Sequence, residues 1–150
     1  MQTKAAPSAT GLALMIVRLS RMAGYRLGEA LAALKMRTHE FSVLNYLAEA
    51  GPVSQQEVGR ALRINPSNLV GLLDLLEGDG LLVRARDPED RRRHLVQLTP
   101  AGRRRLAHAW QAAEAAEEDL LSPLAPAERD QLRSALERLV GHGCGGGRRC

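Results

Sequence analysis

The stretch that decides the fold runs from Leu81 to Pro100 and has the sequence LLVRARDPEDRRRHLVQLTP. Two short runs of alternating apolar and polar residues, LLVRAR and HLVQL, flank the turn-forming segment from Asp87 to Asp90. Such alternation predicts strands, and an Asp-Pro pair is typical of the connection between them. Thr99 followed by Pro marks the beginning of a helix. The stretch therefore predicts a β-hairpin that leads directly into a helix.

The tip of this hairpin concentrates positive charge. Arg91, Arg92 and Arg93 are consecutive, and no acidic residue occurs from 91 to 113, whereas residues 114–119 have the sequence EAAEED. The chain has a formal net charge of +4 and a pI near 9.7. A basic segment separated from the acids is typical of proteins that bind nucleic acid. A solvated charged turn is the alternative that these residues leave open.

Helices are predicted on both sides of the hairpin, from apolar residues that recur every three or four positions and from capping residues. The expected helices run from Leu12 to Leu34, from Thr38 to the GPVS at 51–54, from Ser54 to about Leu62, from Pro66 to the GDG at 78–80, from Pro100 to about Leu121, and from Pro126 to Gly141. Their expected core residues include Phe41, Leu44, Leu47, Ala48, Leu69, Leu72, Leu73 and Leu76. Two short helices with a tight connection, followed by a basic hairpin, predict a winged helix-turn-helix.

The composition indicates a soluble globular domain. The 150 residues are 45% hydrophobic and 25% charged, and no segment approaches the ~20 apolar residues of a membrane span. We therefore expect no membrane contact and a location in the cytoplasm. Cys144 and Cys150 are the only cysteines, so no disulfide framework is expected. Both are interpreted as incidental free thiols, with redox sensing as the alternative.

The segment from Leu72 to Leu106 resembles the wing region of the MarR family of bacterial transcriptional regulators. The matching residues are Leu76-Glu77 before Gly80, Asp87-Pro88, Asp90-Arg91-Arg92, Leu98-Thr99 and Gly102. The resemblance continues upstream and downstream and covers about residues 12–140. It implies an obligate homodimer built from the first and last helices, a pseudo-palindromic operator in double-stranded DNA and, in many members, a small-molecule effector that releases the DNA.

These observations together predict a mainly α fold with a small β-hairpin wing and long terminal dimerisation helices. The expected organisation is a frayed N-terminus at 1–9, a dimerisation helix at 10–36, a winged helix-turn-helix DNA-binding module at 37–99, dimerisation helices at 100–141 and a flexible Gly-rich tail at 142–150. The function expected is that of a sequence-specific repressor. The alternative is an architectural, weakly sequence-specific DNA-binding protein. We do not expect an enzyme, because no catalytic constellation or phosphate-binding glycine loop is present.

The arginines of the tip are predicted to enter the minor groove, where narrow A·T-rich DNA concentrates negative potential. Arginine suits this role because its planar guanidinium is weakly hydrated. Asp87 and Asp90 are expected to brace the hairpin, and the family resemblance implies a pairing of Asp87 with Arg91.

The fourth helix is predicted to be the recognition helix, with Asn65, Ser67 and Asn68 at the end that meets base edges. A role for Asn65 as a helix cap only is left open. Gln55 and Arg63 are predicted to contact phosphates. Arg84 and Arg86 are either backbone contacts or solubility charges. Gly71, Leu75 and Asp74 on the exposed face weaken direct readout and favour recognition by the wing and by DNA shape.

Neither a cofactor nor a metal is expected. His39, Glu40 and His108 lie where zinc-sensing relatives place ligands, but Ala112 stands where a second histidine one turn after His108 would be needed. An effector pocket between the dimer helices and the winged module is predicted to include Arg18, Tyr25 and His39. Ordinary core or interface roles are the alternative for these side chains.

Overall fold

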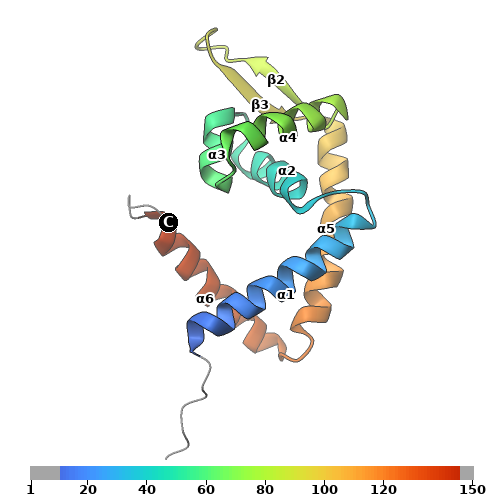
Figure 1. Ribbon diagram of the computed structural model, residues 1–150, viewed down its shortest axis with the longest axis vertical. Coiled ribbons are helices and arrows are strands. Elements are labelled where there is room, and N and C mark those ends of the chain that lie inside the picture. Colours follow the sequence, from blue (N-terminus) through green and yellow to red (C-terminus); the bar gives the residue numbers. More distant parts are fainter. Residues whose placement is uncertain (1–10, 146–150) are drawn as a thin grey trace, which may run out of the picture.

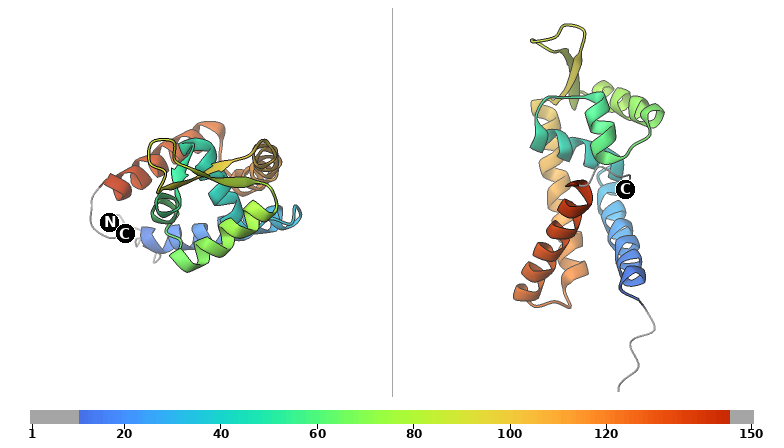
Figure 2. Two further views of the ribbon diagram at one scale, coloured as in Figure 1. Left: turned by 90° about the horizontal axis from the view of Figure 1, so that it is seen from above. Right: turned by 90° about the vertical axis from the view of Figure 1, so that its left-hand side faces the viewer.

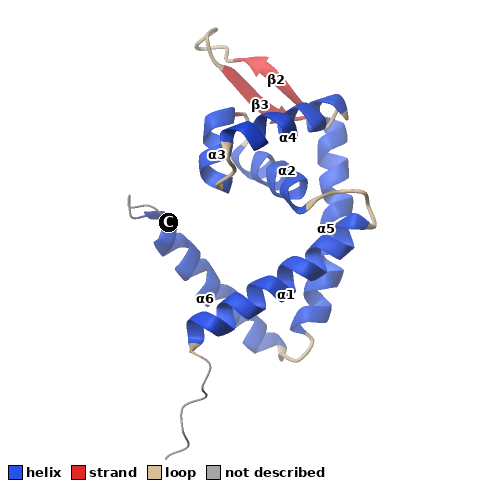
Figure 3. Cartoon of the chain, viewed as in Figure 1, coloured by secondary structure: helices blue, strands red, loops and turns tan. Residues whose placement is uncertain are grey.

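The computed structural model describes residues 11–145. Helices are α1 (Leu12–Ala32), α2 (Thr38–Ala50), α3 (Gln55–Leu62), α4 (Pro66–Gly78), α5 (Pro100–Leu121) and α6 (Pro126–Gly145), and strands are β1 (Val53–Ser54), β2 (Leu82–Arg86) and β3 (His94–Leu98). The expected fold class is confirmed, because the chain is mainly helical and its strands form one small antiparallel sheet (Figure 3).

The elements form two regions along the long axis of the molecule (Figure 1). The winged module, which we define as α2 to β3, lies at one end, and the β2–β3 hairpin projects from it. The N-terminal half of α1 and the turn between α5 and α6 lie at the opposite end (Figure 2). Helix α5 runs through both regions, and α1 and α2 both pack against it.

The core of the winged module is built from leucine and valine. Leu44, Leu73 and Leu82 are completely buried, and they bring together α2, α4 and the base of the hairpin. Of the expected core residues, Leu72 is only half-buried and Ala48 is exposed. Ala48 lies in the last turn of α2, where no neighbouring element covers it.

The sheet contains a strand that the sequence did not predict. β1 pairs with β3 in antiparallel register, with Val53 opposite Val96, so that the order is β1-β3-β2. Its two residues are too few to display alternation. The hairpin itself lies in the expected place, and Arg84 pairs with Val96 and Arg86 with His94.

The helix boundaries follow from their capping residues. The side chains of Ser54 and Asn65 accept hydrogen bonds from the backbone N–H groups of Glu57 and Ser67, at 3.3 Å and 3.0 Å. Between α3 and α4, Arg63 adopts a left-handed conformation with φ of 53°. This residue ends α3 and turns the chain directly into α4.

Some expected boundaries are wrong, and others are outside the described residues. Helix α6 continues past Gly141 to Gly145, because single glycines weaken a helix without preventing it. The expected frayed segment 1–9 and Cys150 lie outside the described residues, as does the side chain of Cys144.

The hairpin and α5 are joined by a close backbone contact. Thr99 Oγ1 donates to the Gly80 carbonyl oxygen at 2.6 Å and accepts from the Gly102 N–H at 3.0 Å. A Cβ on Gly102 would lie 1.9 Å from the carbonyl oxygen of Leu81. The absence of a side chain at this position therefore lets the first turn of α5 lie against the base of the hairpin.

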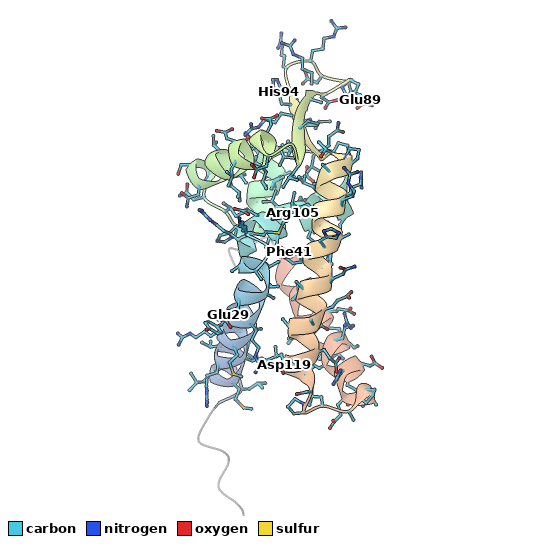
Figure 4. All side chains as sticks on the ribbon, turned by 90° about the vertical axis from the view of Figure 1, so that its right-hand side faces the viewer. Glu29, Phe41, Glu89, His94, Arg105 and Asp119 are labelled. Carbon is cyan, nitrogen blue, oxygen red and sulfur yellow. The ribbon has the colours of Figure 1, made fainter. Side chains whose placement is uncertain are left out.

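Side chains of α5 contact both the winged module and the segment that follows α1. Trp110 of α5 meets the ring of Phe41 of α2 edge-on, with centroids 5.2 Å apart, and its Nε1 donates to Asn45 Oδ1 at 3.1 Å. The guanidinium of Arg105 donates to the backbone carbonyl oxygen of Leu34, just beyond α1. Figure 4 shows Arg105 and Phe41 midway along the molecule.

Replacing Gly102 with alanine is expected to lower the free energy of unfolding by ~1–3 kcal/mol, because the first turn of α5 must move away from Leu81. Urea denaturation followed by circular dichroism measures this change. Gly71→Ala is the matched control, since nothing lies within 4 Å of a Cβ there, and it is expected to raise stability by ~0.5–1 kcal/mol. Equal stability of Gly102→Ala and the unaltered protein would contradict the close contact.

Candidate nucleic-acid interface

The exposed face of α4 and the wing lie at the same end of the molecule (Figure 1). Leu69, Leu73 and Leu76 bury one side of α4, so its other side faces outward. Asn65, Ser67 and Asn68 are exposed at the N-terminal end of this helix. Asn65 serves as its cap, and its Oδ1 also accepts from the Ser67 hydroxyl at 2.7 Å.

The wing is the β2–β3 hairpin together with its tip at 87–93. Asp87 Oδ1 accepts from the Glu89 N–H at 2.9 Å, and Asp90 Oδ1 accepts from the Arg92 N–H at 3.0 Å. The Arg93 carbonyl oxygen accepts from the Asp87 N–H at 2.9 Å and closes the tip. Both aspartates thus contact the backbone of the turn.

The pairing of Asp87 with Arg91 implied by the family resemblance is absent from the described structure, where neither aspartate of the tip forms an ion pair. The physical reason is local, because an aspartate in a tight turn reaches the N–H group two residues ahead. The three arginines of the tip are exposed. Their guanidinium groups therefore project from the backbone-braced turn into solvent.

Arg84 has a different environment from the one expected. Its guanidinium binds Glu77 Oε2 at 2.5 Å and Asp74 Oδ1 at 2.7 Å, and its side chain is only 21% exposed. Its backbone N–H also donates to Glu77 Oε1 at 3.0 Å. The sequence predicted a phosphate contact or a solubility charge at Arg84 and did not predict this ion-pair cluster. Asp74 and Glu77, one turn apart on α4, hold this side chain against the helix.

These contacts shift the pKa values of the partners. The backbone N–H of Arg84 is the main reason why the pKa of the Glu77 carboxyl is below its usual value; burial opposes this shift, and the guanidinium adds to it. Burial lowers the pKa of Arg84, but its bonds to Asp74 and Glu77 outweigh this effect and raise it. Both groups are charged at neutral pH, and Arg84 offsets one of the two negative charges that Asp74 and Glu77 place on α4.

The remaining predicted DNA contacts surround α4 and the wing. Arg63 and Arg86 are exposed, and Gln55 is half-buried in the first turn of α3. The residue that sequence reasoning missed is Glu77, which holds Arg84 against α4. The spacing of Asp74 and Glu77 on α4 is the only sequence signal of the cluster around Arg84, and it identifies the cluster only once the hairpin is known to fold back onto α4.

Positive and negative charges are separated along the molecule. The acids of the C-terminal half of α5 pair with arginines of the other long helices: Asp119 with Arg26, Glu118 with Arg129, and Glu117 with Arg133. In Figure 4, Asp119 lies far from His94 of the wing. Three of the four acids of the run at 114–119 thus form contacts between helices, whereas the arginines of the tip have no ion-pair partner among residues 11–145.

A cavity of about 450 Å³ opens between the α1–α2 connection and the C-terminal end of α4. Its lining residues are Ala32, Lys35, Met36, Arg37, Glu40, Leu75 and Asp79. Of the three predicted effector-binding residues, His39 precedes the lining residue Glu40 in sequence but does not itself line the cavity. Arg18 and Tyr25 lie on α1, two turns or more before Ala32, and the Tyr25 hydroxyl donates to Glu29 at 2.7 Å.

The described residues, 11–145, hold neither a candidate metal site nor a membrane-spanning helix. No three His, Cys, Asp or Glu side chains there come together as a group that could hold a metal ion. None of the helices described has the length and apolar character needed to cross a bilayer.

Comparison with known proteins decides the family. A model of the MarR family matches residues 34–93. The transcriptional regulator PecS of Dickeya dadantii is 32% identical over 128 residues, which cover 83% of this chain and 77% of PecS. The chain belongs to the MarR family of winged helix-turn-helix transcriptional regulators. This is a family of regulators and not of enzymes.

Two solved structures of the transcriptional repressor CouR extend the likeness. CouR bound to a 23-mer DNA duplex is 33% identical, with a TM-score of 0.78, over 93% of this chain and 99% of that chain. CouR from Rhodococcus jostii RHA1 bound to p-coumaroyl-CoA is 32% identical, with a TM-score of 0.73, over 85% and 90% of the two chains. The chain matches only 60% and 64% of the length of two further curated regulators.

The pKa of Glu77 leads to a prediction about acid stability. A lowered pKa in the folded chain means that the carboxylate stabilises the fold above pH 4.5, the usual glutamate value, and that this contribution is lost as the pH falls through the lower folded value. Glu77→Gln removes the contribution. We expect the difference in free energy of unfolding between wild type and Glu77→Gln to be largest near neutrality and to shrink below pH 4.5.

Urea denaturation at a series of pH values measures this difference. Glu89→Gln is the matched control, because Glu89 lies in the hairpin that also carries Arg84 but its side chain forms no ion pair in the described structure. A wild type–Glu77→Gln difference that stays constant across the pH series would show that Glu77 does not titrate as inferred.

Proposed function

We propose that the protein is a homodimeric, sequence-specific DNA-binding regulator that acts in the cytoplasm as a repressor. One observation carries the proposal: the outward face of α4 and the unpaired arginines of the wing are presented together at one end of the molecule. Structural similarity to CouR solved with a DNA duplex supports this function. Such an arginine-bearing surface fits the negatively charged phosphates of DNA.

Each element has a distinct role in the proposed complex. Helix α4 enters the major groove with Ser67 and Asn68 near the base edges. One or more arginines of the tip, from Arg91 to Arg93, enter the adjacent minor groove, and Gln55, Arg63 and Arg86 contact phosphates. Arg84 acts through α4 by shielding the DNA from Asp74 and Glu77, so it is a positioning residue.

The apolar surface of the long helices supports a homodimer. On α1, Leu12 and Met15 are 73% and 53% exposed; on α6, Leu136, Leu139 and Val140 are 44%, 62% and 66% exposed. An apolar surface of this extent is typical of an interaction site. A second copy of the chain would cover both helices and present two copies of α4 to half-sites about one helical turn apart.

We also propose that a small ligand releases the DNA. CouR has been solved with p-coumaroyl-CoA, and this supports an organic effector for the present protein. Arg18, Tyr25 and His39 remain the predicted contacts of the effector. Release of a bound duplex during titration with candidate compounds would identify the effector.

Substitutions in the wing test the proposed DNA contact. Arg91→Ala or Arg92→Ala is expected to weaken operator binding by ~1–3 kcal/mol and to reduce the salt dependence, because a guanidinium leaves the groove. Fluorescence anisotropy with a duplex from the protein's own promoter measures both quantities. Arg91→Lys is the control that keeps the charge and removes the planar fork. Unchanged affinity in both alanine variants would remove the wing from the mechanism.

A charge on α6 tests the dimer. Leu139→Glu is expected to convert dimers into monomers at micromolar concentration, because a carboxylate cannot be desolvated cheaply within an apolar interface. Sedimentation velocity measures the mass. Val83→Glu is the matched control, since Val83 is an exposed apolar residue of the wing and lies outside the proposed interface. A monomeric wild type, or a dimeric Leu139→Glu, would contradict this assignment of the interface.

A binding assay in which unrelated DNA competes with the operator distinguishes this function from that of an architectural DNA-binding protein. A sequence-specific regulator is expected to prefer its operator over unrelated DNA by a factor of at least ~10³ at physiological salt. A smaller ratio would favour the architectural role, which the few free polar groups on α4 would then explain.

A further inference from the structure

Most polar groups on the outward face of α4 already bind other groups of the protein. The N–H and hydroxyl groups of Ser67 both donate to Asn65 Oδ1, at 3.0 Å and 2.7 Å. Asp74 is bound to Arg84 at 2.7 Å, and Gly71 between them has no side chain. Few free polar groups therefore remain along the centre of this face.

Two large apolar residues of α4 are exposed: Leu75, which lines the cavity, and Val70, which does not. The side chain of Val70 is 42% exposed. Valine is a weaker helix former than alanine or leucine, and the described structure covers it only in part. A residue that contradicts local preference without a compensating contact is expected at a functional position.

The place of Val70 on the helix directs it toward the wing. Val70 precedes Glu77 by seven residues, or about two turns, so both lie on the same side of α4. Glu77 contacts the backbone and the guanidinium of Arg84 in β2. Val70 therefore lies on the wing-facing side of α4, nearer the N-terminal end of the helix, next to the surface proposed to receive DNA.

We propose that Val70 recognises the C5 methyl group of a thymine in the major groove, so that each half-site requires a T·A pair at one position. This inference rests on the proposed function and names the base that α4 selects. Thymine is the base that presents a methyl group in the major groove, and small apolar side chains contact it there.

The magnitude follows from the burial of one methyl group. About 0.8 kcal/mol per methyl-sized group corresponds to roughly fourfold in affinity per half-site, or roughly sixteenfold for a symmetric pair. A loss of this size is measurable when uracil replaces thymine, because uracil lacks only the methyl group.

The test uses the full-length protein and a duplex selected from a randomised DNA library. At each half-site position that holds thymine, the two symmetry-related thymines are replaced together by uracil. The dissociation constants of these duplexes are measured for wild type, Val70→Ala and Leu75→Ala. We expect one symmetric position at which uracil weakens the wild type roughly sixteenfold, and at which Val70→Ala binds both duplexes equally. Leu75→Ala is the matched control, because Leu75 is 45% exposed but lines the cavity beside Met36, and it should keep the wild-type preference.

Two results would overturn the inference while the proposed function stands. One is a wild type that binds uracil and thymine duplexes equally at every position; the other is a Val70→Ala variant that keeps the full preference. If the library yields no enriched duplex, the proposed function fails and the role of Val70 fails with it. Because alanine is the better helix former, Val70→Ala should unfold at no lower temperature than wild type.

Discussion

In the first turn of α5, the backbone of Gly102 approaches the carbonyl oxygen of Leu81 so closely that no side chain would fit between them. Thr99 completes the junction by bonding to both sides of it. Helix α5 begins at this junction and then carries the contacts to α1 and α2. The atoms of this junction consequently determine both the direction of the wing and the direction of the exposed apolar helices α1 and α6.

The second constraint on the molecule is electrostatic. Acids in the C-terminal half of α5 pair with Arg26, Arg129 and Arg133, and the acids of α4 pair with Arg84. Such pairs contribute little stability where they are exposed. Their larger effect is on the distribution of charge, because they occupy acids of α4 and α5, whereas the arginines of the tip form no ion pair among residues 11–145.

Much of the fold was predictable from the sequence because its signals are local. Asn65 and Thr99 each cap the helix that the capping rules assign to them, and alternation placed both strands of the hairpin. The failures required knowledge of tertiary contacts. β1 is recognisable only by its pairing with β3, and Arg84 could not be placed without knowing that the hairpin folds back onto α4. The turn at the tip shows the same limit, since spacing alone does not distinguish an aspartate that binds a guanidinium from one that binds the backbone.

Trp110 is the only tryptophan of the chain, and its indole lies where the winged module meets α5, against Phe41 and hydrogen-bonded to Asn45. Its ring is partly open to water, with 38% of the residue exposed. The intrinsic fluorescence of Trp110 therefore reports on the contact between the two regions. A rotation of α2 relative to α5 would separate the edge-on rings and free the indole N–H, and the spectrum would record that movement without any attached dye.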